Sequence, residues 1–327
     1  MGQGYRPYRR ATEGNIAMKI NPKARIDASK VRVRRGGSRG FPMPGSGGSG
    51  GGGFPIPTGG GIGGLVVVVI ILVVVTMCSG GIPGTGGGGG DTSASDQLEN
   101  CQTGADAADN EQCKLALYVN VIENYWQDAL PQQANTDYQH SEMEIFSGST
   151  SSGCGQASSA MGPFYCPADK QVYIDDTFFD DMLQGQLGAR GGDFAEAYVV
   201  AHEYGHHVQD LLGTMAKAQS RETGPTSPSV RLELQADCYA GIWAHNATTV
   251  EDADGNVFIT DLTKDDIERA IDAATAVGDD RIQQRSQGHV NEEQWTHGSA
   301  QERVHWFMTG YQSGDLDACN TFAADAL

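Results

Sequence analysis

The chain has 327 residues and a formal net charge of −19, but its charge is distributed very unevenly. Residues 1–40 contain eleven Lys or Arg and two acids, a net charge of +9, whereas residues 41–90 contain no charged side chain and the remainder carries a net charge of −28. The first 100 or so residues therefore differ in kind from the rest, which argues against two globular domains and favours one, over residues 97–327.

The N-terminal segment, residues 1–61, is basic and rich in glycine. Its second half, residues 36–61, is mostly Gly with some Pro and Ser, a composition that favours flexible linkers and cannot bury a core. The Lys and Arg of this arm follow no helical or motif pattern. We therefore expect a disordered cytoplasmic arm whose charges attract anionic lipid headgroups, and we expect no nucleic-acid partner. Residues 82–96, also rich in Gly and Ser, are predicted to be a linker.

Residues 62–81 are predicted to form one transmembrane helix. They contain the apolar run Val66–Met77, which with its uncharged flanks approaches the ~20 residues needed to cross a bilayer. Basic residues lie upstream and none lie close downstream, so the positive-inside rule predicts a single-pass protein of the cell membrane with a cytoplasmic N-terminus and an extracytoplasmic domain. A cleaved signal peptide is the first alternative, but the run begins late and no convincing cleavage motif follows it. A buried core strand is the second, but its Gly-rich surroundings leave it nothing to pack against.

Six of the seven cysteines lie beyond residue 100, in the segment predicted to be exported. An even number of cysteines in an exported segment indicates disulfide bonds. Six cysteines allow fifteen pairings, and the sequence does not choose among them. We favour two local pairs and one distant pair, namely Cys101–Cys113, Cys154–Cys166 and Cys238–Cys319. A cysteine-rich zinc site is the weaker alternative, because no C-x-x-C occurs.

The hydrophobic pattern of residues 97–327 predicts an α+β fold that is mainly helical with a small strand component. The alternating residues Gln171–Asp175 predict a half-buried strand, and Asp252–Asn256 resembles the start of a calcium loop but lacks its later Glu, so we expect a turn there. The predicted helices are Glu111–Leu130, stopped by Pro131; Asp193–Leu212, with Asp193 as a cap; Val230–Asn246; Thr263–Val277; and Ser299–Gly310.

The second of these helices carries His-Glu-Tyr-Gly-His at residues 202–206, an H-E-x-x-H pattern. Positions four apart on a helix point the same way, so the imidazoles of His202 and His206 can reach one metal ion. Glu203 can lie over the same ion without binding it, as a general base for a zinc-activated water. An exposed His/Glu patch is the alternative, but the largely apolar residues before the motif should carry His202 into the interior.

The next predicted helix supplies Glu233 and, four residues later, Asp237. Glu233 offers a third metal ligand, and Asp237 can accept the free N–H of a metal-bound imidazole. Solvated helix carboxylates are the alternative for both. Two ligands on one helix and one on the next leave a fourth tetrahedral position for water, the arrangement of a catalytic zinc. Gly205 weakens the helix by ~1 kcal/mol relative to Ala, so we expect another element to approach it closely.

H-E-x-x-H followed by E-x-x-x-D on a later helix resembles the gluzincin arrangement of zinc peptidases. Four segments carry a closer resemblance, namely Gly162–Pro167, Val172–Asp175, His202–His207 and Leu234–Gly241. With them, residues 97–325 resemble the putative neutral zinc metallopeptidase family of bacterial membrane-anchored proteins. The resemblance implies a zincin-like core with a small sheet, Zn²⁺ bound by His202, His206 and Glu233, and hydrolysis of peptide or protein substrates with Glu203 as the catalytic base.

A donor for the oxyanion of the reaction is sought near the last predicted helix. His297 and Arg303 stand six apart there, similar to the late His and Arg pair of the zinc peptidases typified by the heat-shock and prenyl-protein proteases, although Gly298 replaces the usual Pro. Both are catalytic candidates; a capping His and a surface Arg are the alternatives. Tyr165 and Tyr173 are lesser candidates. An exposed edge of strand 171–175 could pair with an extended peptide substrate.

Two other functions remain open at this point. A membrane-tethered scaffold or binding module could carry a non-catalytic zinc site, but a structural zinc is usually closed by four protein ligands, whereas here three ligands accompany a Glu placed as a base. Zinc-dependent hydrolysis of a non-peptide amide, such as cell-wall material, is a further alternative that the sequence leaves open.

Overall fold

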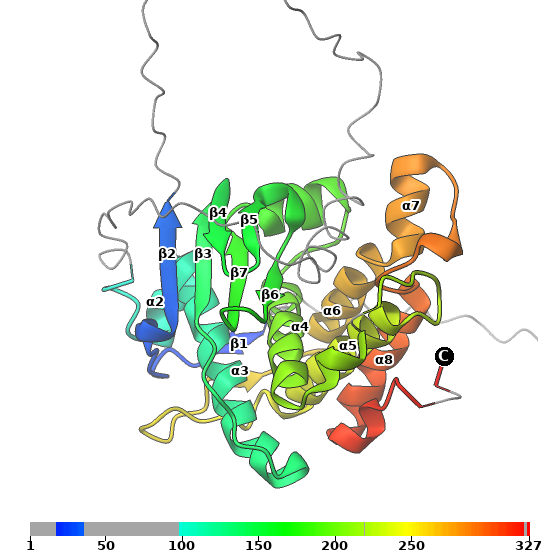
Figure 1. Cartoon of the computed structure of the whole chain (residues 1–327). Helices are drawn as coiled ribbons and strands as arrows, with labels where there is room; N and C mark the ends of the chain where they lie inside the picture. The colour runs from blue at the N-terminus through cyan, green and yellow to red at the C-terminus, as the bar shows by residue number, and fades with distance from the viewer. Residues whose placement is uncertain (1–17, 36–97, 219, 324–325) are drawn as a thin grey trace, which may run out of the picture.

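The computed structural model describes residues 18–35, 98–218, 220–323 and 326–327 (Figure 1). The predicted transmembrane helix 62–81 and linker 82–96 lie outside the described residues, as do residues 1–17 and 36–61 of the predicted arm. Among the helices that are described, none is long and apolar enough to cross a membrane.

The five predicted helices are all present, and α4, α5, α6 and α8 lie together on one side of the molecule, with the strands on the other (Figure 1). Two further short helices, α2 and α7, were not predicted. The helices are α2 (Gly104–Asp109), α3 (Glu111–Ala134), α4 (Asp193–Leu211), α5 (Pro228–Asn246), α6 (Lys264–Ala276), α7 (Asp279–Gln287) and α8 (Ala300–Ser313). A π-helix, η5 (Phe178–Gln186), follows β7, and the short 3-10 helices are η1 (Ala28–Lys30), η4 (Ser159–Met161), η6 (Thr214–Ala218), η7 (Glu292–Gln294) and η8 (Leu316–Cys319).

Two predicted helix boundaries differ for identifiable reasons. Pro131 does not stop α3, which continues to Ala134 and ends where Asn135 adopts a left-handed backbone with φ of 49°. Proline has no backbone N–H, so Pro131 removes one hydrogen bond of the helix. Only three residues of α3 follow it, so this loss falls at the end of the helix. At the start of α4, Asp193 is the first helical residue and Gly192 occupies the cap position, so the predicted cap is displaced by one residue.

The main sheet has four strands in the order β2-β3-β7-β6. β2 (Val31–Arg35), β3 (Met143–Ser147) and β7 (Gln171–Asp175) run parallel, and β6 (Phe164–Cys166) pairs antiparallel with β7. The prediction that strand 171–175 is a half-buried edge strand is wrong, because β7 lies between two strands and its last four residues are all buried. β6 is the edge strand on that side of the described sheet. Two smaller sheets pair β1 (Lys19–Ile20) with β8 (Ile259–Asp261) and β4 (Ser149–Ser152) with β5 (Gly155–Ser158).

Residues 18–35 belong to the folded domain, so the prediction that residues 1–61 form a disordered arm is wrong for this part, and the domain does not begin at residue 97. β2 is paired along its whole length with β3, and β1 with β8. Val31 and Val33 are buried in the same hydrophobic core as α3 and α4, and Arg32 and Arg34, which alternate with them, are exposed. This alternation of apolar and basic residues is that of a half-buried strand, and its period of two was present in the sequence.

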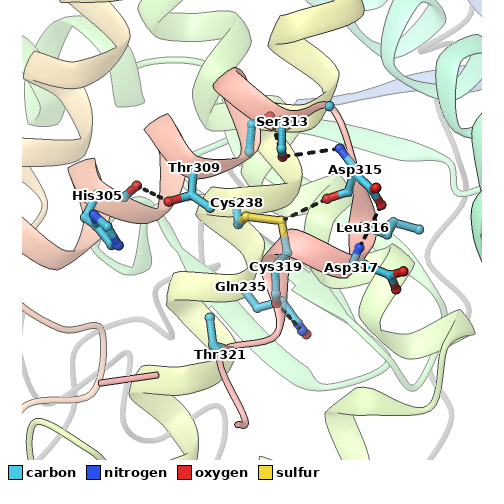
Figure 2. Close-up of a disulfide and its surroundings, with 12 residues drawn as sticks. Gln235, Cys238, His305, Thr309, Ser313, Asp315, Leu316, Asp317, Cys319 and Thr321 are labelled. Carbon is cyan, nitrogen blue, oxygen red and sulfur yellow. Dashed lines mark hydrogen bonds between the residues drawn. A yellow bond between two sulfur atoms is a disulfide. The ribbon is translucent and has the colours of Figure 1, made fainter. Parts of the chain in front are cut away.

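The three favoured disulfides are confirmed: Cys101–Cys113, Cys154–Cys166 and Cys238–Cys319. Figure 2 shows the third, which ties η8 to α5, with Gln235 Nε2 donating to the Cys319 carbonyl at 2.9 Å. α5 also packs closely against α8, since a Cβ on Gly241 would lie 2.0 Å from the Phe307 carbonyl oxygen. α5 is thus held on two sides, which fixes the helix that presents Glu233 and Asp237.

Candidate metal centre

The H-E-x-x-H residues lie on α4, which is buried along most of its length. Gly205 faces α5, where an added Cβ would lie 3.0 Å from the Ala236 carbonyl oxygen. The close approach expected at Gly205 is therefore confirmed, and any larger residue would push the two helices apart. Because the backbones are this near, carboxylates of α5 can reach imidazoles of α4.

Three side chains converge between these helices. His202, His206 and Glu233 each offer one ligand atom, and these atoms lie within 4.8 Å of one another. Nε2 of His202 is 3.1 Å from one Glu233 oxygen, and Nε2 of His206 is 3.6 Å from the other. Two imidazole nitrogens and one carboxylate oxygen in a buried position are a donor set that suits Zn²⁺, so the residues fit the ion that the sequence predicts.

The other ring nitrogen of each histidine has its own acceptor. Nδ1 of His202 lies 2.9 Å from Asp237 Oδ1, and Nδ1 of His206 lies 2.9 Å from Gln209 Oε1. Each Nδ1 donates its proton there, which leaves the lone pair of Nε2 free for a metal. Gln209 was not singled out from the sequence, although its position three residues after His206 on one helix is the signal that could have found it.

Asp237 is fully buried and holds three partners at once. Besides His202, it accepts from the Tyr198 hydroxyl at 2.5 Å and from the Arg303 guanidinium at 2.7 and 2.9 Å. Burial alone would raise the pKa of Asp237, but Arg303 and His202 outweigh it and lower this pKa to about 2. Asp237 is therefore ionised, and it can fix both the orientation and the protonation of His202.

Arg303 has its guanidinium directed at Asp237, Tyr198 and the Val277 carbonyl. Its side chain is 5 % exposed. One guanidinium nitrogen of Arg303 lies 3.4 Å from Nδ1 of His202. The carboxylate of Glu233 lies on the other side of the ring, at Nε2. Arg303 also lines the cavity over the metal ligands, with its guanidinium hydrogen-bonded to Asp237 and Tyr198.

Glu203 is 7 % exposed and lines the same cavity as the three ligands. Burial raises the pKa of its carboxyl group above the ordinary value, although His202 and His206 oppose that effect. A carboxylate with a raised pKa is a stronger proton acceptor, which is the property that a general base requires.

His297 lies in the loop before α8 and also lines this cavity. Asp279, the first residue of α7, accepts the backbone N–H groups of Thr296, His297 and Gly298 through Oδ2, at 2.7, 2.7 and 3.0 Å. Its Oδ1 lies 3.3 Å from Nδ1 of His297. One buried carboxylate thus holds the loop, and it holds the ring together with Thr296 Oγ1, which lies 2.9 Å from the same Nδ1. Asp279 was missed in the sequence, because no local pattern links it to a residue eighteen positions later.

The backbone at Gly298 explains why proline is absent after His297. Its φ is 89°, a left-handed value that glycine adopts freely. Proline is locked near a φ of −65° and could not take this conformation. The loop that presents His297 therefore follows a different path from one with proline at this position.

The two lesser tyrosine candidates are separated by the fold. Tyr165 lines the cavity with its ring, but its hydroxyl donates to Asp210 at 2.9 Å and lies 3.1 Å from His207 Nδ1. Tyr173 donates to Asp169 at 2.7 Å and stacks on Phe164 in a second, smaller cluster. Tyr165 is thus beside the centre with its hydroxyl engaged, and Tyr173 is not brought to it.

The cavity over the metal ligands has a volume of about 210 Å³ and a mostly apolar wall. That wall comes from β6, η4, η5, η6, α4, α5, α7 and α8 and from the loops beside them. Its apolar members include Met161, Pro163, Phe164, Phe178, Met182, Leu187, Met215, Leu232, Val277 and Ile282. The edge strand β6 contributes Phe164 and Tyr165 to this wall, so the edge strand of the described sheet borders the cavity.

Comparison with known proteins finds one family and several relatives. The model of a family described as "putative neutral zinc metallopeptidase" matches residues 23–322. The uncharacterized protein Rv2575 of Mycobacterium tuberculosis (strain ATCC 25618 / H37Rv) is 50% identical over 228 residues, which are 69% of this chain and 76% of that protein. The uncharacterized protein YpfJ of Escherichia coli (strain K12) is 45% identical over 218 residues, 64% of this chain and 72% of that protein. No solved structure gives a significant match.

Proposed function

Because the chain belongs to the putative neutral zinc metallopeptidase family, we propose that it is a zinc-dependent peptidase that hydrolyses peptide bonds. The observation that carries this proposal is the convergence of His202, His206 and Glu233 beneath a cavity that also contains Glu203. Three protein ligands with an adjacent buried carboxylate match a catalytic metal site, in which one position stays open, better than a closed structural site.

The residues around the site then take separate roles. When bound, zinc would supply the positive charge that polarises a water molecule and the scissile carbonyl. Glu203 accepts the proton that the attacking water loses and passes it to the nitrogen of the peptide bond that breaks. His297 donates an N–H to the oxygen of the tetrahedral intermediate, and Asp279 keeps its ring in place for that bond.

Asp237 and Arg303 act on the metal site through His202, on the side of its Nδ1. Asp237 holds the Nδ1 proton of His202, and Arg303 neutralises the buried carboxylate. Arg303 is therefore a positioning residue in this proposal and does not contact the substrate. Its role differs from the catalytic one predicted from the sequence.

The cavity wall suggests which peptides are cleaved. A pocket lined by Met161, Phe178, Met182 and Ile282 stabilises a large apolar side chain and rejects a charged one. Methionine side chains adapt their shape, so several apolar residues can be accommodated. The favoured substrate is a peptide or protein segment with a large apolar residue next to the scissile bond.

The three disulfides support an extracytoplasmic location for this domain, since such bonds persist in oxidising compartments. Contact with membrane lipid through the apolar residues 62–81, without a single crossing that would divide residues 18–35 from residues 98–327, is part of the proposal and rests on the apolar run in the sequence.

Digestion of a peptide library by the zinc-loaded full chain tests the function. We expect cleavage with a preference for large apolar residues at one position beside the cut, loss of cleavage with a chelator, and recovery when zinc is restored. Binding of zinc with no cleavage of any peptide would favour the tethered scaffold. Cleavage without an apolar preference would contradict the substrate class and leave the peptidase standing.

A further inference from the structure

Residues 18–35 are joined to the rest of the domain by backbone pairing. β2 pairs with β3 in parallel register from Val31–Met143 to Arg35–Ser147, and β1 pairs with β8. Between them, an isolated bridge links Arg25 to Thr103. These partners all lie on the far side of residues 36–97 in the chain, so the sheet is completed by a segment that precedes the apolar run.

The same segment contributes to the hydrophobic core. Ala24 is 0% exposed, and Met18, Val31 and Val33 are between 3% and 5% exposed. These side chains pack in the cluster that contains much of α3, α4 and α5. The domain formed by residues 98–327 alone would expose this apolar surface and one more edge of the sheet, a combination that folded proteins avoid.

Five basic residues of this segment are each paired with an acid of the body. The pairs are Lys19–Asp261 at 2.9 Å, Arg25–Asp254 at 3.1 Å, Lys30–Glu123 at 3.4 Å, Arg32–Glu142 at 2.7 Å and Arg34–Glu144 at 3.6 Å. Exposed pairs stabilise little, but Glu123 and Glu144 have side chains only 3% and 2% exposed, so their partners compensate a real desolvation cost. These five basic residues belong to the folded domain. They therefore do not indicate that the N-terminus is cytoplasmic.

We propose that residues 18–35 lie in the same compartment as residues 98–327, docked on the β3 edge and on the five acids that face them. Whatever the course of residues 36–97, the chain leaves this domain at Arg35 and returns to it at Leu98. One membrane crossing between those points would separate β2 from β3. The prediction of a cytoplasmic N-terminus with an extracytoplasmic domain is thus incompatible with the paired sheet. This inference does not depend on the proposed peptidase activity.

Epitope tags at residue 1 and at residue 327 of the full chain, expressed in a bacterial host, test the topology. A membrane-impermeant protease is added to spheroplasts before and after the membrane is opened. We expect both tags to be cut in intact spheroplasts or both only after opening, because they share a compartment. One tag cut and the other protected in intact spheroplasts would overturn the proposal.

A second measurement tests the docking itself in the purified full chain. Val33→Asp places a charge in the core and is expected to lower the melting temperature by roughly 5 °C or more. Lys23→Asp, at an exposed position of the same segment, is the matched control and should leave the melting temperature nearly unchanged. A melting temperature unaffected by Val33→Asp would show that the segment is not docked.

Discussion

The Arg303 guanidinium donates two hydrogen bonds to the Asp237 carboxylate, from Nε to Oδ2 at 2.7 Å and from Nη2 to Oδ1 at 2.9 Å. Both side chains are almost completely buried, at 5% and 0% exposure. Since Asp237 also holds Nδ1 of His202, the pair joins α8 to a candidate metal ligand on α4. In the proposed function this pair keeps His202 in position, so Arg303 has a positioning role there.

Arg303→Ala should lower both stability and metal affinity. The substitution leaves Asp237 buried without its charge partner, which is expected to destabilise the fold by about 3–5 kcal/mol. Zinc affinity should fall by roughly 10–100-fold, because the orientation of His202 loosens. Arg281→Ala, on the surface of α7, is the control. A lower kcat with unchanged melting temperature and zinc affinity would contradict this prediction. It would favour a catalytic role for Arg303 instead.

His297→Ala should lower kcat by ~10²–10³, the usual loss for one oxyanion donor, with unchanged zinc content. Asp279→Asn should also lower kcat, because the ring of His297 is less well held. Its effect on KM should be smaller than its effect on kcat. His305→Ala, an exposed histidine on α8, is the control. A histidine that only caps the helix would give a lower melting temperature and normal turnover.

Removal of the Cys238–Cys319 disulfide should destabilise the domain. It closes the longest of the three loops, with a sequence separation of 81, and loop-closure entropy predicts about 4.5 kcal/mol for such a bond. Its cysteine on α5 adjoins Asp237, so loss of zinc on heating should also begin earlier. Thermal melts of Cys319→Ala check this, with Cys78→Ala as the control. Equal melting temperatures for the two variants would contradict a structural role for the bond.

Glu196 predicts a specific dependence of stability on pH. Burial and the Glu111 carboxylate raise the pKa of Glu196 to about 7, although Lys114 opposes them. In the unfolded chain its pKa returns to about 4.5. The folded state therefore binds the proton more tightly, and stability falls as pH rises from about 4.5 to about 7.

The substitution Glu196→Gln removes that ionisation. The melting temperature of Glu196→Gln minus that of the unsubstituted chain should rise between pH 5 and pH 8, because only the unsubstituted chain loses stability when residue 196 ionises. Glu268→Gln, exposed on α6, is the control and should show no such trend. A difference that stays constant over this range would mean that Glu196 does not titrate there.

The parts of the site that could be predicted from the sequence are those encoded within one helix. His202, His206 and Glu203 share a motif on α4, and Glu233 and Asp237 share a face of α5, so helical spacing alone predicted that each set points one way. The convergence of the two sets required the contact of α4 with α5, for which Gly205 was the single local sign.

The remaining features depend on contacts between distant segments, which no local pattern encodes. Asp279 acts on a loop eighteen residues later, and β7 became a central strand only because β6 pairs with its other side. Residues 18–35 were assigned to a disordered arm because glycine-rich sequence follows them, although Val31 and Val33 alternate with arginines as in a half-buried strand.

Zinc content and peptide hydrolysis, measured on the same preparation of Glu203→Gln, test the central claim most directly. The variant should keep one zinc per chain, because His202, His206 and Glu233 are intact, and should lose hydrolysis by at least ~10²-fold, because an amide cannot accept the proton of water. His202→Ala, His206→Ala and Glu233→Ala should lose the metal itself. Turnover near that of the unsubstituted chain in zinc-loaded Glu203→Gln would contradict the account.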